Sequence, residues 1–474
     1  MFRWPGSGRE RDGLGWYARL AWPITERLRR GGKATSMAQV VALRALALAV
    51  NICTGLLTAA VLGPSGRGEL AALTVAPGFL GGLASLGLHG SLIYNLKADP
   101  AHERELLGNG IMLTLLTGCI VMVGGWIVEP YWLNLYSPHT IFIGRILLLS
   151  APTVVMGWSM SGAVESRGWF GLVNSVLYLQ SLATLALLGV LTLLHCLTPT
   201  VAAFAYTIPG VSCFGYLFFQ VLRRMRPVFR PRLEMVRRLL RYGIRLCGVD
   251  ILGTLSGVLD QLVIVAFLPA GMVGTYAVAL SSARILTVVQ SGVSTVLFPS
   301  IAARDVPTIV RTVAVAFRFA SLLIAGIAAV LLLVGPPLLL LAYGTKFAPA
   351  IMPFRILLLA MVIENGARIL HQIYAGCGRP ELVTLFEGFA VAVLLLAMLA
   401  LVPPLGTLGA ALAVLCTASF RLVVAIGGLP LMLKIPLPRL VFGWDDLRLL
   451  RAMLAHPGAA PALAASPSAL EGVP

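Results

Sequence analysis

Charged residues are scarce in this sequence. Only 12% of its 474 residues are Asp, Glu, Lys or Arg, whereas 58% are hydrophobic and the mean hydropathy is +0.91. A soluble domain carries about 25% charged residues, so this chain cannot build a water-facing surface over its whole length. Its apolar runs also lack the strict alternation of a membrane β-barrel. These absences predict an all-α, polytopic membrane protein.

Recognisable catalytic motifs are also absent. Gly31-Gly-Lys-Ala34 does not match the G-x-x-x-x-G-K-[ST] phosphate loop. The seven cysteines and six histidines are scattered and lack the spacing of metal ligands. The connections expected on the outer side are too short to hold the active-site domain of a membrane glycan polymerase or transferase. We therefore expect no catalysis, no cofactor and no metal site.

Twelve apolar runs are long enough to cross a bilayer, which takes about 20 residues per helix. They are expected at 38–62, 69–94, 108–128, 141–165, 171–195, 198–222, 243–268, 271–300, 312–342, 350–374, 382–403 and 406–432. The pattern predicts an N-terminal lobe at 38–222 and a C-terminal lobe at 243–432, with a central cavity between them. A basic segment at 1–37, an Arg-rich linker at 223–242 and a tail at 433–474 complete the chain.

The position of the basic residues gives the orientation. The net charge of +17 could suggest nucleic acid as a partner, but 26 of the 36 Lys and Arg fall in alternate connections or the two terminal segments. The opposite connections contain only Arg67 and Lys346. Because basic loops stay on the cytoplasmic side, both termini and the linker are expected in the cytoplasm, and no nucleic acid partner is expected.

The two halves carry a faint repeat. Residues 61–73, with Gly63-Pro-Ser-Gly-Arg-Gly68, resemble residues 267–280, with Pro269-Ala-Gly-Met-Val-Gly274. Both are predicted as Gly/Pro turns on the outer side. Repeated halves of this kind are typical of transporters with a substrate site between the halves. Residues 16–30 interleave aromatics and arginines, which fits either an amphipathic helix on the membrane surface or a disordered basic tail. Residues 454–474 are predicted to be disordered.

Eight arginines remain inside the predicted spans, against four or five acidic residues. The arginines are Arg44, Arg145, Arg245, Arg284, Arg318, Arg355, Arg368 and Arg421, and the acids are Asp250, Asp260, Glu364 and Glu387, with Glu165 at a span end. An excess of guanidinium groups favours a cationic cavity and an anionic substrate, because guanidinium binds phosphate in a bidentate fork.

Other roles remain open for most of these charges. Arg145, Arg318 and Arg368 lie near span ends, where arginine side chains reach the interface. Glu364 stands four residues before Arg368, so the two can form a pair within one helix. Asp260 can pair with an arginine or anchor a span end. Arg44 and Arg284 lie in long apolar runs and are the strongest candidates to face the cavity.

Several motifs resemble bacterial polysaccharide flippases of the Wzx type. They are Asn51, Leu62-Gly-Pro-Ser-Gly-Arg-Gly-Glu69, Leu86-Gly-Leu-His-Gly-Ser-Leu-Ile-Tyr94, Leu259-Asp-Gln-Leu-Val-Ile264, Gly274-Thr-Tyr-Ala-Val-Ala279 and Leu341-Ala-Tyr-Gly-Thr-Lys-Phe-Ala348. Their order and spacing carry the likeness over roughly residues 38–430. The resemblance implies the fold of the multidrug/oligosaccharidyl-lipid/polysaccharide exporter (MOP) superfamily, with two six-helix lobes and alternating access.

The same resemblance implies a substrate and a site. The substrate would be an undecaprenyl-diphosphate-linked oligosaccharide that crosses the bacterial cytoplasmic membrane for exopolysaccharide, capsule or O-antigen export. In related lipid II flippases, arginines of the first and eighth spans meet the diphosphate, and Arg44 and Arg284 occupy those spans here. Arg67, Arg145, Asp260, Arg318 and Arg368 are weaker candidates. Membrane lipids and the polymerase and glycosyltransferases of the pathway are the other candidate partners.

Three alternatives stay open. A peptidoglycan lipid II flippase has the same architecture, although that branch typically has two more C-terminal spans. A drug/cation antiporter of the superfamily would line its cavity with acidic residues, contrary to the excess of arginine. A membrane glycan polymerase would need longer outer connections.

Overall fold

The described part of the chain is entirely helical. The computed structural model describes residues 33–301, 304–443 and 446, and this part contains no β-strand. The segment at 16–30, predicted as a surface helix or a basic tail, and the predicted disordered end at 454–474 lie outside the described residues. The elements are α2 (Lys33–Ala84), α3 (Leu88–Ala98), η2 (Pro100–His102), α4 (Glu103–Trp132), α5 (Pro138–Leu148), α6 (Ala151–Ser166), α7 (Phe170–Leu193), α8 (Pro199–Met225), α9 (Leu233–Phe267), α10 (Ala270–Ala283), η3 (Arg284–Leu286), α11 (Thr287–Ile301), α12 (Val306–Tyr343), η4 (Thr345–Ala350), α13 (Ile351–Gly376), α14 (Pro380–Leu405) and α15 (Thr407–Met432).

Eleven helical stretches of the described chain are long and apolar enough to cross a membrane. The first of them, Ala49–Ala98, has 50 residues, which is about 75 Å of helix at 1.5 Å per residue and more than twice the ~30 Å hydrocarbon core of a bilayer. It therefore contains two crossings. The protein is an all-α polytopic membrane protein of about twelve spans, as the sequence predicts.

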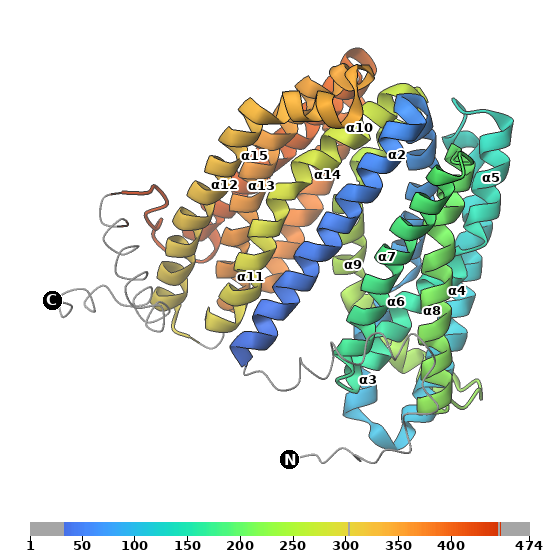
Figure 1. Ribbon diagram of the computed structural model, residues 1–474. Helices are drawn as coiled ribbons and strands as arrows, with labels where there is room; N and C mark the ends of the chain where they lie inside the picture. The colour runs from blue at the N-terminus through green and yellow to red at the C-terminus, as the bar shows by residue number, and fades with distance from the viewer. Residues whose placement is uncertain (1–32, 302–303, 444–445, 447–474) are drawn as a thin grey trace.

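The first two crossings are joined at Gly63. The sequence predicts a separate Gly/Pro turn there, but α2 continues with helical geometry on both sides of a single kink at Gly63, where φ is 67° and ψ is −175°. Pro64 follows directly and cannot donate a helical hydrogen bond. A positive φ strains any residue with a side chain, so glycine is required at this reversal. Figure 1 shows α3 at the same end of the molecule as the start of α2.

The helices form two lobes (Figure 1). We call α2–α8 the N-lobe and α10–α15 the C-lobe, and α9 connects them. The foot of α9 bonds to α3 and α4, and its upper half contacts α2, the outer end of α4 and α14. We call the end of the molecule at Gly63 the outer end. The end at which α3 stops and α9 begins is the inner end, and the distribution of basic residues predicts that it faces the cytoplasm.

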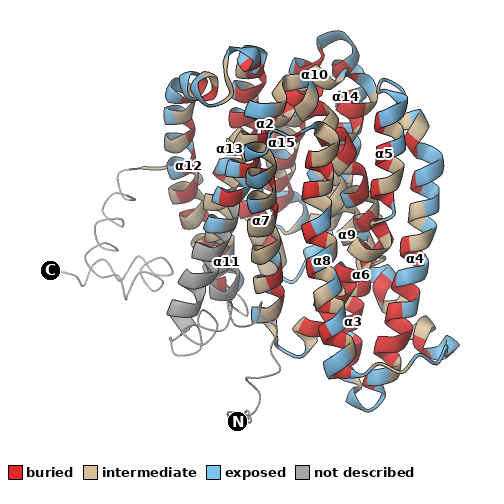
Figure 2. Ribbon diagram, turned by 45° about the vertical axis from the view of Figure 1, so that its right-hand side comes forward, coloured by how far each residue is buried: buried red, intermediate tan, exposed pale blue. Residues whose placement is uncertain are grey.

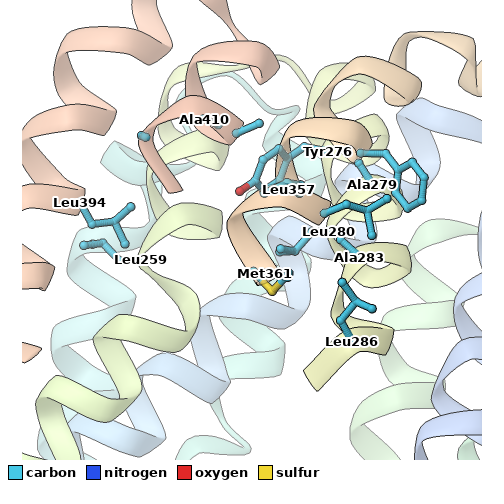
Figure 3. Close-up of a cluster of buried hydrophobic side chains, with 14 of the residues drawn as sticks. Leu259, Tyr276, Ala279, Leu280, Ala283, Leu286, Leu357, Met361, Leu394 and Ala410 are labelled. Atoms are coloured by element: carbon cyan, nitrogen blue, oxygen red, sulfur yellow. The ribbon is translucent and has the colours of Figure 1, made fainter. Parts of the chain in front are cut away.

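Buried apolar side chains fill each lobe. The C-lobe core includes Tyr276, Leu280, Leu286, Leu357 and Met361, which come from α10, η3 and α13 (Figure 3). Large apolar side chains are also exposed on the outside, such as Ile127 of α4 and Leu333 of α12, and Figure 2 shows exposed residues along the outward faces of these helices. Exposed apolar surface of this extent fits contact with lipid.

The linker and the tail contain more structure than the sequence indicates. Within the predicted linker at 223–242, only residues 226–232 lie outside helices, since α8 ends at Met225 and α9 begins at Leu233. Pro227 and Pro231 exclude a continuous helix between them. The tail folds back on α12, where Phe442 packs edge-to-face against Phe319.

Candidate functional site

A break in the eighth crossing positions Arg284. Helix α10 ends at Ala283, a 3₁₀ turn spans Arg284–Leu286, and α11 continues from Thr287. The Arg284 Nη2 donates to the backbone carbonyl of Gly257 in α9 over 3.0 Å. No carboxylate hydrogen bond to Arg284 occurs among the described residues, so its other N–H donors are available to a ligand. The break thus presents a half-buried guanidinium at mid-span.

Asp260 lies beside this arginine. It is 5% exposed, and the Tyr276 hydroxyl donates to its Oδ2 over 2.9 Å. Arg284 is close enough to act electrostatically on Asp260 without a direct hydrogen bond. The sequence left open whether Asp260 pairs with an arginine or anchors a span. In this structure the Asp260 carboxylate accepts a hydrogen bond from buried Tyr276, and it takes no hydrogen bond from Arg284.

A buried ion network joins four helices of the C-lobe side. The Arg421 Nη1 donates to Glu364 Oε1 over 2.7 Å, and its Nη2 lies 3.0 Å from Glu387 Oε2. Arg421 also donates to Ser256, which in turn donates to Glu387. Arg368 donates to Glu364 over 2.9 Å, which confirms the predicted pair within α13. Two guanidinium and two carboxylate charges therefore cancel inside the lobe.

Three polar atoms of this network have no hydrogen-bond partner among the described residues. They are the Nε of Arg421, the Nε2 of His371 and the Oδ1 of Asn365. The His371 ring also lies near Glu387, with 3.9 Å between Nδ1 and Oε1. Sequence reasoning did not select Ser256, His371 or Glu387 as site residues. In the sequence they stand out only as polar residues within apolar runs, and this feature does not predict which side chains are in contact.

The N-lobe candidates lie toward the outer end. Arg145 of α5 stacks over the Trp126 ring, 5.5 Å from its centroid, and Glu129 lies close enough to act on it electrostatically. Arg67 follows the Gly63 kink, and its Nε is buried without a hydrogen-bond partner in the described structure. Neither side chain forms an ion pair within the described part of the chain, so both retain hydrogen-bonding capacity.

The remaining predicted site residues are placed as follows. Arg318 does not extend freely to the interface, because it donates to Asp446 over 3.0 Å and to the carbonyl of Arg439 over 2.7 Å. Arg368 is held by Glu364. Arg44 lies within α2, but its side chain is outside the described residues. Whether Arg44 and Arg284 face each other thus stays a prediction.

The two repeated motifs pack against each other at the outer end. A Cβ at Gly68 of α2 would collide with the backbone of Ala270 in α10, and a Cβ at Gly274 would collide with the backbone of Pro64. Each motif therefore supplies the glycine that the backbone of the other requires. The lobes meet most extensively through α2 and α10, so this conformation is closed at the outer end.

Ion pairs at the inner end tie the foot of α9 to the N-lobe. Arg238 donates to Asp99 over 2.7 Å, and Arg232 donates to Glu105 over 2.6 Å. Hydrogen bonds from Arg238 and His102 lower the pKa of Asp99 to about 2. These contacts keep the Arg-rich segment ordered against α3 and α4.

Comparison with solved structures reveals the same fold in transporters. The inward closed conformation of the lipid II flippase MurJ gives a TM-score of 0.70 at 12% identity, covering 87% of this chain and 92% of that chain. An inward-facing multidrug resistance MATE family transporter of the MOP superfamily gives 0.64 at 15% identity, covering 79% and 92%. A MOP superfamily transporter from Pyrococcus furiosus gives 0.56 at 13% identity, covering 84% and 95%. These likenesses show that the fold is that of the MOP superfamily.

One curated protein matches part of the sequence. Heme A synthase from Rhodopseudomonas palustris (strain HaA2) is 28% identical over 170 residues, which are 36% of this chain and 41% of that protein. The chain spans less than half the length of this relative, and the match does not place it in that family. The polysaccharide biosynthesis protein family, by contrast, matches residues 39–303, more than half of the chain. The chain therefore belongs to the polysaccharide biosynthesis protein family and has the fold of a MOP-superfamily flippase.

Proposed function

We propose that this protein is a flippase that moves polyprenyl-diphosphate-linked oligosaccharide units across the cytoplasmic membrane for export of a surface polysaccharide. The observation that carries the proposal is the state of Arg284. It is a permanently charged group at a helix break within a span, and its one hydrogen bond in the described structure goes to a backbone carbonyl. A diphosphate is the part of such a substrate that a guanidinium binds best.

The other intramembrane arginines support this choice by contrast. Arg421, Arg368 and Arg318 each donate to a carboxylate, so their charges are compensated within the protein. Arg284 lies near buried Asp260, which accepts from Tyr276 and does not bond the guanidinium. Arg44 from the first crossing is proposed as its partner across the cavity, with Arg67 as a later contact near the outer end.

The packing of the lobes supports alternating access as the mechanism. The outer end is closed by the glycine contact between α2 and α10. Opening this contact would expose the bound head group to the other leaflet, and no bond is made or broken in the cargo. The termini would lie in the cytoplasm, as the basic residues predict.

A deletion and complementation experiment tests the proposal. Deleting the gene in its native bacterium should abolish the surface polysaccharide, and the wild-type gene should restore it. Arg284→Gln should lower the restored amount about tenfold or more, because a hydrogen bond between charged groups contributes about 1.5–3 kcal/mol. Arg284→Lys should restore part of it.

Arg355→Gln is the matched control, since Arg355 also lies in a span but is exposed at the outer end of α13. It should complement fully. Normal polysaccharide in the deletion strain would refute the proposal. Cell lysis with accumulated lipid II would instead indicate a peptidoglycan precursor flippase, and a changed drug susceptibility alone would indicate a drug antiporter.

A further inference from the structure

A groove of about 480 Å³ lies at the inner end, where α3 crosses the foot of α9. Tyr94 of α3 and Tyr242 of α9 stack within it, with ring centroids 4.2 Å apart and ring planes 7° apart. Tyr94 remains 51% exposed, so aromatic surface is open to the groove. The other walls include Gly90, Ile93, Lys97 and Leu246.

One uncompensated cation lines this groove. Lys97 is exposed, and the described structure gives it no hydrogen bond or ion pair. Arg241 and Arg245, which are also exposed, precede the groove residues Tyr242 and Leu246 in α9. Arg238, one turn before Tyr242, is by contrast engaged by Asp99 and Asn95. The apolar stretch of α9 that can span the membrane begins only at Asp250. The groove therefore lies where the membrane interface meets the aqueous side.

The groove also lies at the foot of one particular face of α9. At about 100° per residue, Tyr242, Leu246, Gly253 and Gly257 fall within about 60° of one another. Gly253 and Gly257 are exposed, and a Cβ on either would meet nothing within 4 Å. This face ends at the Gly257 carbonyl that Arg284 contacts, about 22 Å above Tyr242.

The flanks of that face belong to different lobes. On one side, Gly243 packs on Gly87 and Thr254 packs on Gly82, both in the N-lobe. On the other side, Leu252 lies against Gly388, and Ser256 bonds Glu387, both in the C-lobe. The open stretch at Gly253 and Gly257 therefore lies between the lobes, on the same side of α9 as Tyr242 and next to the carbonyl that Arg284 contacts.

We propose that this groove is a receiving site for the sugar-diphosphate head group of the substrate, occupied before the diphosphate reaches Arg284. This inference rests on the proposed function and adds a second site to it. The exposed aromatic surface packs against the C–H face of the first sugar ring. Lys97 in the groove wall attracts the diphosphate, and Ile93 and Leu246 offer apolar contact to the start of the lipid chain.

The position of the tyrosines distinguishes this site from an ordinary belt of interfacial aromatics. Tyr94 and Tyr242 pair with each other across two helices, at the foot of the side of α9 that carries Gly253 and Gly257. Tyr131, an aromatic near the outer end of α4, is 79% exposed and forms no such stack. Because the groove needs α3 and α9 packed together, it exists in the conformation described here, and its ligand should stabilise that conformation.

Binding of two short soluble probes to the purified full-length protein in detergent tests the inference. The probes are farnesyl diphosphate and farnesyl-diphosphate-linked N-acetylglucosamine; the second carries the sugar and one ionisable oxygen fewer, so each variant is compared with the wild type for the same probe. Tyr94→Ala should weaken binding of the sugar probe about tenfold and leave farnesyl diphosphate nearly unchanged. Lys97→Gln should weaken both probes. Tyr94→Phe keeps the aromatic face and should bind like the wild type, which separates loss of the ring from misfolding.

Tyr131→Ala is the matched control and should not change either affinity. Equal loss of both probes in Tyr94→Ala, or wild-type affinity in both Tyr94→Ala and Lys97→Gln, would overturn the receiving site while leaving the flippase proposal standing. Failure of the wild-type protein to bind either probe would instead count against the proposed function itself.

Discussion

In the C-lobe, an ion network centred on Arg421 lies buried between α9, α13, α14 and α15, whereas the N-lobe ion pairs lie at the inner ends of α3 and α4. In the Arg421 network, opposite charges neutralise one another away from lipid. At the inner end, water also solvates the charged groups. These two sets of ion pairs therefore compensate their charges in different ways. The difference shows that an intramembrane arginine is informative only after its partners are known.

The largest difference in stability is expected when one partner is removed from each kind of ion pair. Arg421→Met leaves Glu387 without an arginine and buried Glu364 with Arg368 alone, and it should destabilise the protein by about 3–5 kcal/mol. Arg232→Gln removes a pair whose arginine side chain is 47% exposed and should cost about 0.2–1 kcal/mol. Thermal unfolding in detergent measures both changes.

A variant that removes the buried charges together serves as the control. Arg421→Met combined with Glu364→Gln and Glu387→Gln should recover part of the stability that Arg421→Met loses. If Arg421→Met proves as mild as Arg232→Gln, the distinction between buried and peripheral pairs is wrong.

The two lobes should contribute equally to the backbone contact at the outer end, whereas their ion pairs differ. Gly68→Ala and Gly274→Ala each place a Cβ against the backbone of the opposite lobe, and overpacking of this kind costs about 1–3 kcal/mol. Both should loosen the closed end to a similar extent. The measurement is disulfide formation between Ser65→Cys and Gly271→Cys in a cysteine-free background, since these positions adjoin.

Gly124→Ala provides the control for this pair, because a Cβ there meets nothing within 4 Å. It should leave the cross-linking yield unchanged. A reduced yield in only one of the two glycine variants would show that the lobes do not contribute equally to closure.

The smallest effect concerns the pH dependence of the inner-end contacts. Arg238 and His102 hold the pKa of Asp99 at about 2, below its value of about 4 in an unfolded chain. The stabilisation from Asp99 is therefore fully present above about pH 4 and declines as the pH falls toward 2. In a His102→Gln background, which removes the titratable neighbour of Asp99, the difference in melting temperature between Asp99 and Asp99→Asn should stay constant from pH 5 to pH 8. A difference that changes across that range would assign the contact to another titrating group.

Hydropathy and charge predicted most of the fold, because both are local properties of the sequence. The apolar runs and the split of basic residues gave about twelve spans and the two lobes. The kink at Gly63 was predicted as a turn, since Gly and Pro signal a reversal without saying how much helix survives around it. The length of α9 into the linker was missed, because its first turns are too basic to resemble a span.

The site was less predictable, because its contacts join residues far apart in the chain. Arg421 meets Glu364 across 57 positions and Ser256 across 165 positions. Counting charges suggested a surplus of free guanidinium, but the structure pairs Arg421, Arg368 and Arg318 and leaves Arg284 without a carboxylate bond in its described surroundings. Only the pair four residues apart, Glu364 and Arg368, could be expected from sequence spacing.

Helix α9 has a mechanical consequence for transport. Its foot is tied to α3 by Arg238, and its upper half is tied to α14 by Ser256, so one helix is anchored in both moving parts. The two lobes can therefore rotate apart only if α9 bends or if its contacts with one lobe break. Gly243, Gly248, Gly253 and Gly257 recur every four or five residues along it, and glycine lowers the resistance of a helix to bending. The stiffness of α9 would then help to determine how fast the lobes exchange their open and closed ends.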